Sequence, residues 1–393
     1  MNVTVCSKNE EELVLDVSGT INSANAKEFQ RLVEEERDAW SHGRLVLDVE
    51  KVEFISSAGL RVLLRLERAA PLRIINASAM LMEVFQDTGF TSILDIRKAI
   101  PEISLDGCEL IGQGANGQVY RLTRETVVKL FGEGAPLSDV ERERELAQRS
   151  LIHGIPTAIT YNLVQSQGRY GAVFELVDAE SLSHVLRDHP ERFDEFAQQY
   201  VDIFRNFHAT NVRDGEFPSI KDIYHDYIAG CADWYTDDEL DLLRAVVDSV
   251  PDRGTLIHGD YHANNILVAD DELIMIDMGD VSVGHPIFDF LATAATQANL
   301  VELNPAFAEV HTGMPVELIK RLWSYLLEHY FAHKDAHEVA RIDQQVRLFS
   351  KLKVACAPML AHNAPIEIVE SSVADAKQNF LPHAQDLIGS VDW

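Results

Sequence analysis

The sequence predicts two domains of different fold class: a small α/β domain, then a larger bilobal α+β domain with a β-rich first lobe and a helical second lobe. Three observations support this. In residues 1–100, short apolar runs alternate with helix-like segments, which predicts a small open sheet covered by helices. Residues 108–180 contain β-branched and apolar runs separated by polar turns. Residues 181–393 show mainly helical periodicity. We expect residues 101–107, which include one proline and one glycine, to form a short linker.

Apolar patterning places the individual elements. The first domain is expected to contain strands at residues 2–6, 13–17, 45–49 and 72–76, and helices at residues 24–40 and 59–67. In the first lobe, strands are expected at residues 119–122, 126–131 and 170–177, with a charged helix at 139–146. In the second lobe, helices are expected at residues 193–210, 240–250, 316–337 and 338–360.

The strongest functional signal is the run His258-Gly259-Asp260 and its sequel. Asn265 follows Asp260 by five positions, and Asp277 follows twelve further on, each on a short loop between strand-like runs. Such oxygen ligands suit Mg²⁺, and the remaining carboxylate can orient a hydroxyl nucleophile, as in kinase-type phosphoryl transfer. The run resembles the signature of the aminoglycoside phosphotransferase and choline kinase family, in which HGD replaces the HRD of protein kinases. The resemblance implies that Asp260 is catalytic and that Asn265 and Asp277 bind Mg²⁺.

A glycine-rich segment lies upstream in the order a kinase requires. Gly112, Gly114 and Gly117 form a G-x-G-x-x-G pattern, which dinucleotide-binding folds share. A dinucleotide-binding loop must open a helix, whereas strand-like runs follow Gly117. We therefore expect a hairpin that covers the phosphates of ATP, with Lys129 on the next strand reaching the α- and β-phosphates. The chain has no Gly-Lys dipeptide, which excludes a Walker-type P-loop.

Two further segments complete the nucleotide site that the resemblance implies. Glu143, in the charged helix, is expected to pair with Lys129, although spacing alone leaves Glu141 and Glu145 open. The strand ending at Glu175 and Val177 looks like the hinge whose backbone meets the adenine of ATP. The resemblance covers residues 108–393.

The segment after Asp277 points to a small-molecule acceptor. Its sequence, DMGDVSVGHPIFD, resembles the corresponding segment of a group of bacterial phosphotransferase-fold proteins with undefined substrates. No A-P-E motif or long Ser/Thr-rich activation segment follows, which argues against a protein kinase switched by phosphorylation. We expect transfer of the ATP γ-phosphoryl group to a hydroxyl. Two alternatives stay open: a nucleotide-binding regulatory module, and a protein kinase acting on a serine of the first domain.

The first domain carries its own signature. Residues 54–64, with residues 75–78 and 85–90, resemble the STAS domain of anti-sigma-factor antagonists, and the resemblance covers nearly all of residues 1–97. In that family a serine in this loop accepts a phosphate, and Ser57 aligns best with it. Ser56 stands where many relatives carry Asp. The alternative is that both serines cap the following helix. The resemblance implies a protein partner for this domain.

Charge and composition limit the classes of partner and the cellular location that we expect for this protein. The net charge is −29, of which residues 1–100 carry −4 and the remainder −25. This charge disfavours nucleic acid and anionic membranes as partners. It is compatible with a cationic acceptor, but solubility is the simpler explanation. We expect a cytoplasmic protein of bacterial type, because neither a signal peptide nor a membrane span is evident. The four cysteines are scattered and suggest neither a disulfide framework nor a zinc site.

One histidine pattern requires a separate explanation. His329, His333 and His337 are spaced by four residues and would share a face of the expected helix 316–337. Metal ligands use this spacing, but H-E-x-x-H is not matched because residue 330 is Tyr. We therefore expect a partly exposed stripe of histidines.

Overall fold

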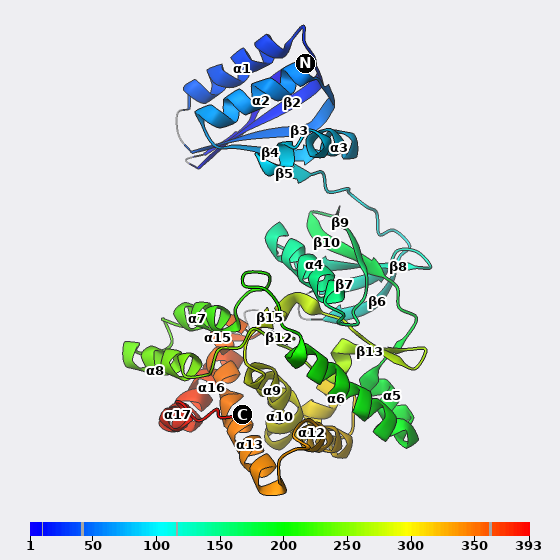
Figure 1. Cartoon of the computed structure of the whole chain (residues 1–393), viewed down its shortest axis with the longest axis vertical. Helices are drawn as coiled ribbons and strands as arrows, with labels where there is room; N and C mark the ends of the chain where they lie inside the picture. The colour runs from blue at the N-terminus through cyan, green and yellow to red at the C-terminus, as the bar shows by residue number, and fades with distance from the viewer. Residues whose placement is uncertain (10, 41–42, 115–116, 361–363) are drawn as a thin grey trace. The chain divides into compact units, whose positions relative to one another are not determined.

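The computed structural model describes residues 1–9, 11–40, 43–114, 117–360 and 364–393. The chain forms two compact units, Met1–Ile103 and Ser104–Trp393. The division falls within the expected linker. Figure 1 shows the first unit in blue to cyan and the second from cyan to red.

The first unit is a mixed sheet with helices, as its sequence pattern predicts. The strands lie in the order β1 (Asn2–Lys8), β2 (Glu12–Ile21), β3 (Arg44–Ile55), β4 (Leu72–Ala77) and β5 (Asp95–Lys98). β1 and β2 are antiparallel, and the other neighbours are parallel. The helices are α1 (Ala26–Asp38), α2 (Ser57–Ala69) and α3 (Ala79–Asp87), and α1 lies beside α2 (Figure 1). Sequence patterning placed neither α3 nor β5.

The core of this unit explains the register of its strands. Alternate residues of β2 point into the core, and helices α1 and α2 each supply an apolar face. The fully or almost fully buried side chains include Leu13, Leu15, Val17, Phe29, Leu47, Val62, Leu66 and Ile74. A shift of one residue in β2 would turn its buried side chains outward, so burial fixes the pairing.

The second unit begins with an antiparallel sheet and one long helix. The sheet order is β6 (Glu109–Gly114), β7 (Gly117–Arg121), β8 (Thr126–Phe131), β10 (Arg169–Glu175) and β9 (Thr160–Ser166). Helix α4 (Leu137–Ile152) follows β8 and packs on β9 and β10 (Figure 1). This arrangement gives the β-rich first lobe that the sequence predicts.

The second lobe is helical, with short strands close to its junction with the first lobe. The short strands are β11 (Glu180–Ser181), β13 (Ile266–Ala269) and β14 (Glu272–Met275) in one sheet, and β12 (Leu256–Ile257) with β15 (Ser282–Val283) in another. The helices are α5 (Leu182–Asp188), α6 (Phe193–Ala209), α7 (Ile220–Gly230), α8 (Asp237–Asp248), α9 (Ile287–Ala294), α10 (Leu300–Leu303), α11 (Pro305–Thr312), α12 (Val316–Tyr330), α13 (Ala336–Phe349), α14 (Lys351–Ala355), α15 (Ala357–Leu360), α16 (Ile366–Asn379) and α17 (Leu381–Leu387). The aromatic stripe of α6 is buried, as its periodicity predicts.

The helix expected over residues 316–337 is present, but it ends seven residues earlier than predicted. Helix α12 ends at Tyr330 and α13 begins at Ala336. Asp335 starts the new helix: its carboxylate accepts the backbone N–H of Glu338 at 2.9 Å, and the Glu338 carboxylate accepts the N–H of Asp335 at 3.2 Å. His329 and His337 therefore lie on different helices, and the expected shared histidine face does not form. The helix expected at 338–360 is also divided, into α13, α14 and α15.

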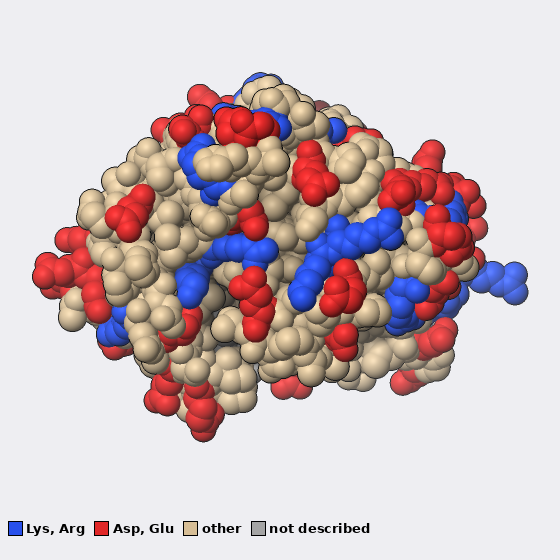
Figure 2. Space-filling model, turned by 90° about the horizontal axis from the view of Figure 1, so that it is seen from below, with Lys and Arg blue, Asp and Glu red and all other residues tan. Residues whose placement is uncertain are grey.

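On the face shown in Figure 2, acidic side chains are spread over the surface, with fewer Lys and Arg side chains between them. No helix of the part of the chain that the structure describes is long and apolar enough to cross a bilayer.

Candidate active site

A buried carboxylate shapes the loop that carries Asp260. Asp289, at the start of α9, is fully buried. Its Oδ2 accepts the backbone N–H of His258 at 2.8 Å, and its Oδ1 accepts that of Gly259 at 2.6 Å. Gly259 has φ +84°, and a Cβ there would lie 2.8 Å from the Asp280 carbonyl oxygen, so glycine is needed at this turn. The loop therefore leaves β12 in one defined direction.

Three side chains surround the Asp260 carboxylate. Lys353 Nζ lies 3.2 Å from Oδ1, and His262 Nε2 lies 3.3 Å from Oδ2. The Asn265 amide donates to the Asp260 carbonyl oxygen at 3.0 Å and to Oδ2 at 3.4 Å. Burial alone would raise the pKa of the Asp260 carboxyl, but Lys353 and His262 hold that pKa well below its usual range. Asp260 is therefore ionised and held in place.

Lys129 joins the two lobes of the second unit. Its Nζ donates to Glu143 Oε1 at 2.7 Å and Oε2 at 2.9 Å, and to Asp277 Oδ1 at 2.8 Å. Of the three glutamates that spacing left open, Glu143 faces Lys129, whereas Glu145 pairs with Arg149 on the surface. Burial would lower the pKa of Lys129, but the two carboxylates hold it above its usual range, so the ammonium is charged.

Asn265 and Asp277 offer oxygen ligands suited to Mg²⁺. Asp277 has φ +59° and directs the chain into the turn Met278–Asp280. Because the Asn265 amide nitrogen donates to Asp260, its oxygen points elsewhere and can bind a cation. Among the residues that the structure describes, no group of three or more His, Cys, Asp or Glu could hold a metal ion. The residues thus fit an ion that takes its other ligands from nucleotide phosphates and water.

The glycine-rich segment forms a hairpin, as expected. Gly114 is paired with Gly117 at the end of β6 and β7, and Gly117 with Phe131 of β8. A Cβ at Gly117 would lie 2.1 Å from the Leu130 carbonyl oxygen, whereas nothing lies within 4 Å of one at Gly114, and Gly112 has ordinary contacts with Val119. The expected cover over the phosphates includes residues 115–116, which lie outside the described residues.

The expected hinge lies at the end of β10. The backbone N–H of Glu175 donates to the Ile159 carbonyl, and the Glu175 carboxylate accepts the N–H of Ile159 at 2.8 Å. The N–H of Leu176 donates to the Glu125 carbonyl. The Glu175 side chain thus ties the strand to the segment before β9, and adenine binding by Glu175 and Val177 remains a prediction about their backbone groups.

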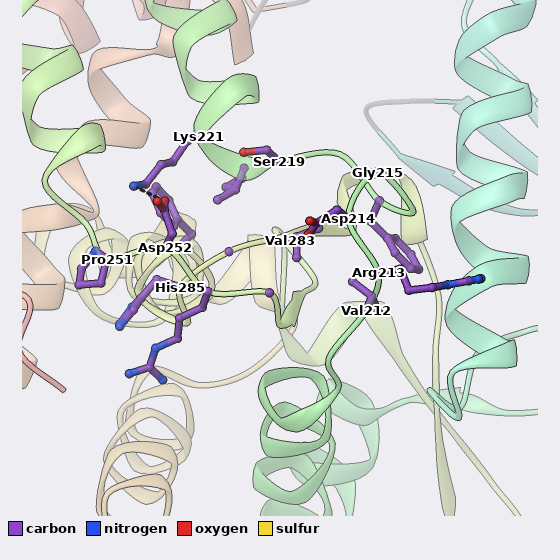
Figure 3. Close-up of a pocket in the computed structure, with 16 residues that line it drawn as sticks. Val212, Arg213, Asp214, Gly215, Ser219, Lys221, Pro251, Asp252, Val283 and His285 are labelled. Atoms are coloured by element: carbon purple, nitrogen blue, oxygen red, sulfur yellow. Dashed lines mark ion pairs between the residues drawn. The ribbon is translucent and has the colours of Figure 1, made fainter.

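A separate hollow of about 360 Å³ lies in the second lobe. Its wall consists of residues 212–215, 217, 219–221, 251–254, 283–285 and 288. Lys221 Nζ lies 2.6 Å from Asp252 Oδ1. Figure 3 shows this ion pair and His285, which also lines the hollow. None of the predicted site residues lines it, so it is distinct from the cluster around Asp260 and Lys129.

Comparison with known proteins identifies the family of the second unit. The model of the phosphotransferase enzyme family matches residues 107–316, more than half of the chain. The chain belongs to the phosphotransferase enzyme family. Similar solved structures include ADP-bound aminoglycoside phosphotransferase APH(2'')-Ib, with 16% identity, a TM-score of 0.48, and coverage of 77% of this chain and 98% of that one. A choline/ethanolamine kinase family protein from Mesorhizobium loti has 14% identity, a TM-score of 0.44, and coverage of 72% and 92%.

The first unit of the chain is a STAS domain, as expected. The STAS model matches residues 4–103. The unit is also similar to a putative anti-sigma factor antagonist, BtrV, of Bordetella bronchiseptica. The two are 35% identical over 91 residues, which is 21% of this chain and 76% of the relative.

The two serines of the STAS loop differ in position. Ser56 is the N-cap of α2, and its Oγ accepts the backbone N–H of Gly59 at 3.4 Å. Ser57 is the first residue of the helix and is exposed. Capping is thus the role of Ser56, and Ser57 stays available as a predicted phosphate acceptor at a helix N-terminus.

Sequence reasoning missed two residues of the candidate site. Asp289 lies 31 positions after His258, and Lys353 lies 93 positions after Asp260. An aspartate in the apolar run Ile287–Ala294 was a signal, because a buried carboxylate needs donors. Lys353 had no such signal, since lysines are common on helix surfaces. His262, two positions after Asp260, also contacts the Asp260 carboxylate.

Proposed function

We propose that the second unit transfers the γ-phosphoryl group of ATP to a hydroxyl of a small molecule. The main supporting observation is that Lys129 contacts both Glu143 and Asp277 and thereby connects the two lobes. A lysine with a buried carboxylate partner suits the binding of α- and β-phosphates, and Asp277 lies beside it as a ligand for the accompanying metal ion. Membership of the phosphotransferase family supports this chemistry.

Each residue has one role in the proposed reaction. The acceptor oxygen forms a bond to the γ-phosphorus as the bond from that phosphorus to the β–γ bridging oxygen breaks. Asp260 orients the hydroxyl and takes its proton. Because Lys353 and His262 keep the pKa of Asp260 low, the carboxylate acts chiefly by orientation, and proton transfer comes late. Lys129 holds the phosphates. Mg²⁺, held by Asn265 and Asp277, would neutralise phosphate charge.

The segment after Asp277 supports a small acceptor. The turn Met278–Asp280 and β15 occupy it, and α9 begins already at Ile287. Protein kinases use a long activation segment at this position to bind a protein substrate. Because this connection is short, we expect side chains of the helical lobe to bind the acceptor.

The test is ADP release with a panel of amino sugars, amino alcohols and neutral sugars, together with mass analysis of the products. We expect at least one acceptor to gain a phosphate, and ADP release to fall to background in Asp260→Ala. Equal ADP release by Asp260→Ala and the wild type would contradict the proposed role of Asp260.

The exposure of Ser57 supports a second proposal, in which the STAS domain is a regulatory unit that is phosphorylated at this serine and binds a protein partner. Intact-mass analysis after incubation with Mg-ATP tests phosphorylation by the chain itself. We expect no added phosphate, because the second unit fits a small-molecule enzyme. A phosphate present on the wild type but absent from both Ser57→Ala and Asp260→Ala would instead identify a protein kinase acting on its own STAS domain.

A further inference from the structure

Lys353 reaches the catalytic carboxylate from a part of the chain outside the recognised motifs. It lies on α14, and its Nζ is 3.2 Å from Asp260 Oδ1. The opposite oxygen, Oδ2, faces His262 and Asn265. Each carboxylate oxygen can accept two hydrogen bonds, so an acceptor hydroxyl can still bind beside Lys353.

Packing of the helix does not explain this lysine. Leu352 and Ala355 are fully buried in the core of the second lobe and anchor α14 there. Lys353 is 29% exposed, so it has lost much of its water and side-chain freedom. Lys351, on the same helix and 28% exposed, lies 4.0 Å from Asp375, away from Asp260. The contact with Asp260 is therefore what accounts for the position of Lys353.

The charge of Lys353 is also defined. Burial would lower its pKa, but the carboxylates of Asp260 and Asp280 hold it above its usual range. The ammonium is thus protonated at neutral pH. Without it, the Asp260 carboxylate would lose an ammonium partner at Oδ1, on the side where an anionic phosphoryl group must be transferred.

We propose that Lys353 is the positioning residue of Asp260 and that it places an ammonium beside the Oδ1 atom to which the acceptor hydroxyl binds. The group beside the reacting hydroxyl is then neutral or anionic rather than an ammonium. This inference rests on the proposed function. Lys353 fixes the Asp260 carboxylate in the orientation that accepts the hydroxyl, and its charge favours the developing charge of the transferred phosphoryl group.

The overall negative charge does not reverse this preference. The charge of −29 acts over the whole surface, and salt screens it beyond about 10 Å. An ammonium on the acceptor would meet Lys353 directly at the carboxylate, where screening is weakest. The acidic composition therefore serves solubility better than acceptor recognition.

The experiment compares Lys353→Met, Lys353→Arg and the matched control Lys351→Met in the full chain. ADP release from Mg-ATP is measured with water and with acceptors, and the Kd of Mg-ATP is measured by binding. We expect Lys353→Met to lower kcat by about tenfold to a hundredfold with an Mg-ATP Kd within about twofold of wild type. Lys353→Arg should recover part of kcat, and Lys351→Met should match wild type.

Asp260→Asn separates failure of this inference from failure of the proposed function. If Asp260→Asn keeps wild-type ADP release, the proposed function fails, and with it this inference. If Asp260→Asn is inactive while Lys353→Met keeps wild-type kcat, only the role of Lys353 is overturned. A lysine that serves the fold alone would lower thermal stability and nucleotide binding in Lys353→Met, and arginine would not restore kcat.

The acceptor class is tested with matched sugars that carry an amino group, a hydroxyl or a carboxylate at one position. We expect kcat/KM to be higher for the neutral and acidic compounds than for the amino compounds. In Lys353→Met, we expect kcat/KM for the amino compounds to rise relative to that for the other two classes. A panel in which only the amino compounds, or none, raise turnover above that with water contradicts this part of the proposal.

Discussion

At the scale of single residues, Gly117 gives the most local prediction. A Cβ at this position would lie 2.1 Å from the Leu130 carbonyl oxygen, which is backbone and cannot turn aside. Gly117→Ala should therefore lower the free energy of unfolding by about 1–3 kcal/mol. Gly114→Ala, where nothing lies within 4 Å of a Cβ, is the control and should leave stability nearly unchanged. Denaturant unfolding measures both, and equal stability of the two variants would contradict the close approach.

His285 predicts a pH dependence of stability. Burial, aided by Arg253, lowers the pKa of His285 to about 4, against about 6.5 in an unfolded chain. The folded state thus binds fewer protons, so the stability contribution is complete above pH 6.5 and is lost as the pH falls toward 4. The loss would be at most roughly 3 kcal/mol.

The measurement compares the free energy of unfolding of the wild type and His285→Gln across this range. Glutamine can still donate to the Trp393 carbonyl oxygen that His285 Nε2 contacts at 2.9 Å. We expect the variant to have the shallower dependence between pH 6.5 and 4. Parallel curves would show that His285 does not remain neutral in the folded protein.

Sequence alone could place the candidate site residues that lie in recognised motifs, but not those that lie outside them. Asp260, Asn265 and Asp277 are close in sequence, and the loops between short strands keep them close in space. Asp289 and Lys353 come from helices α9 and α14, and only the packing of the helical lobe brings them to the same loop. No local pattern encodes such a contact, so it needs the structure.

At the scale of elements, α4 is the helix that brings Glu143 to Lys129. Glu143 is 6% exposed, and its contact with Lys129 joins this helix to β8. Glu143→Gln removes a buried charge whose partner, Lys129, is the proposed phosphate-binding residue, so we expect the Kd of Mg-ATP to rise about tenfold or more. Glu145→Gln, which breaks only the surface pair with Arg149, should have no effect. Similar Kd values for the two variants would refute the role of α4.

Elements with strong apolar periodicity could be predicted from the sequence. Helix boundaries set by capping residues, and very short strands, could not. Helix α6 follows its aromatic stripe, because one buried face determines it. The break between α12 and α13 depends on Asp335 and Glu338, whose reciprocal hydrogen bonds begin a new helix inside a continuous helical pattern. The short strand β5 pairs with β4 at the sheet edge, and its four residues carry too little pattern to be recognised.

At the scale of the whole molecule, the two-unit organisation predicts an independent catalytic unit. The family matches confirm the expected fusion of a STAS domain with a phosphotransferase domain. Every residue assigned to the reaction lies in the unit Ser104–Trp393, which has its own core. A fragment of residues 104–393 should fold and bind Mg-ATP with a Kd within about twofold of that of the full chain. A folded fragment that does not bind nucleotide would show that the site needs the STAS domain.

The division of labour between Asp260 and Asp277 is the central claim. Asp260 is assigned to the acceptor hydroxyl, and Asp277, in contact with Lys129, to the metal and phosphates. The most direct test measures both ADP release and the Kd of Mg-ATP for Asp260→Asn and Asp277→Asn. The account predicts that Asp260→Asn loses turnover by a factor of about a hundred or more with an almost unchanged Kd, whereas Asp277→Asn weakens Mg-ATP binding about tenfold or more. Full turnover in Asp260→Asn, or unchanged Mg-ATP binding in Asp277→Asn, would contradict it.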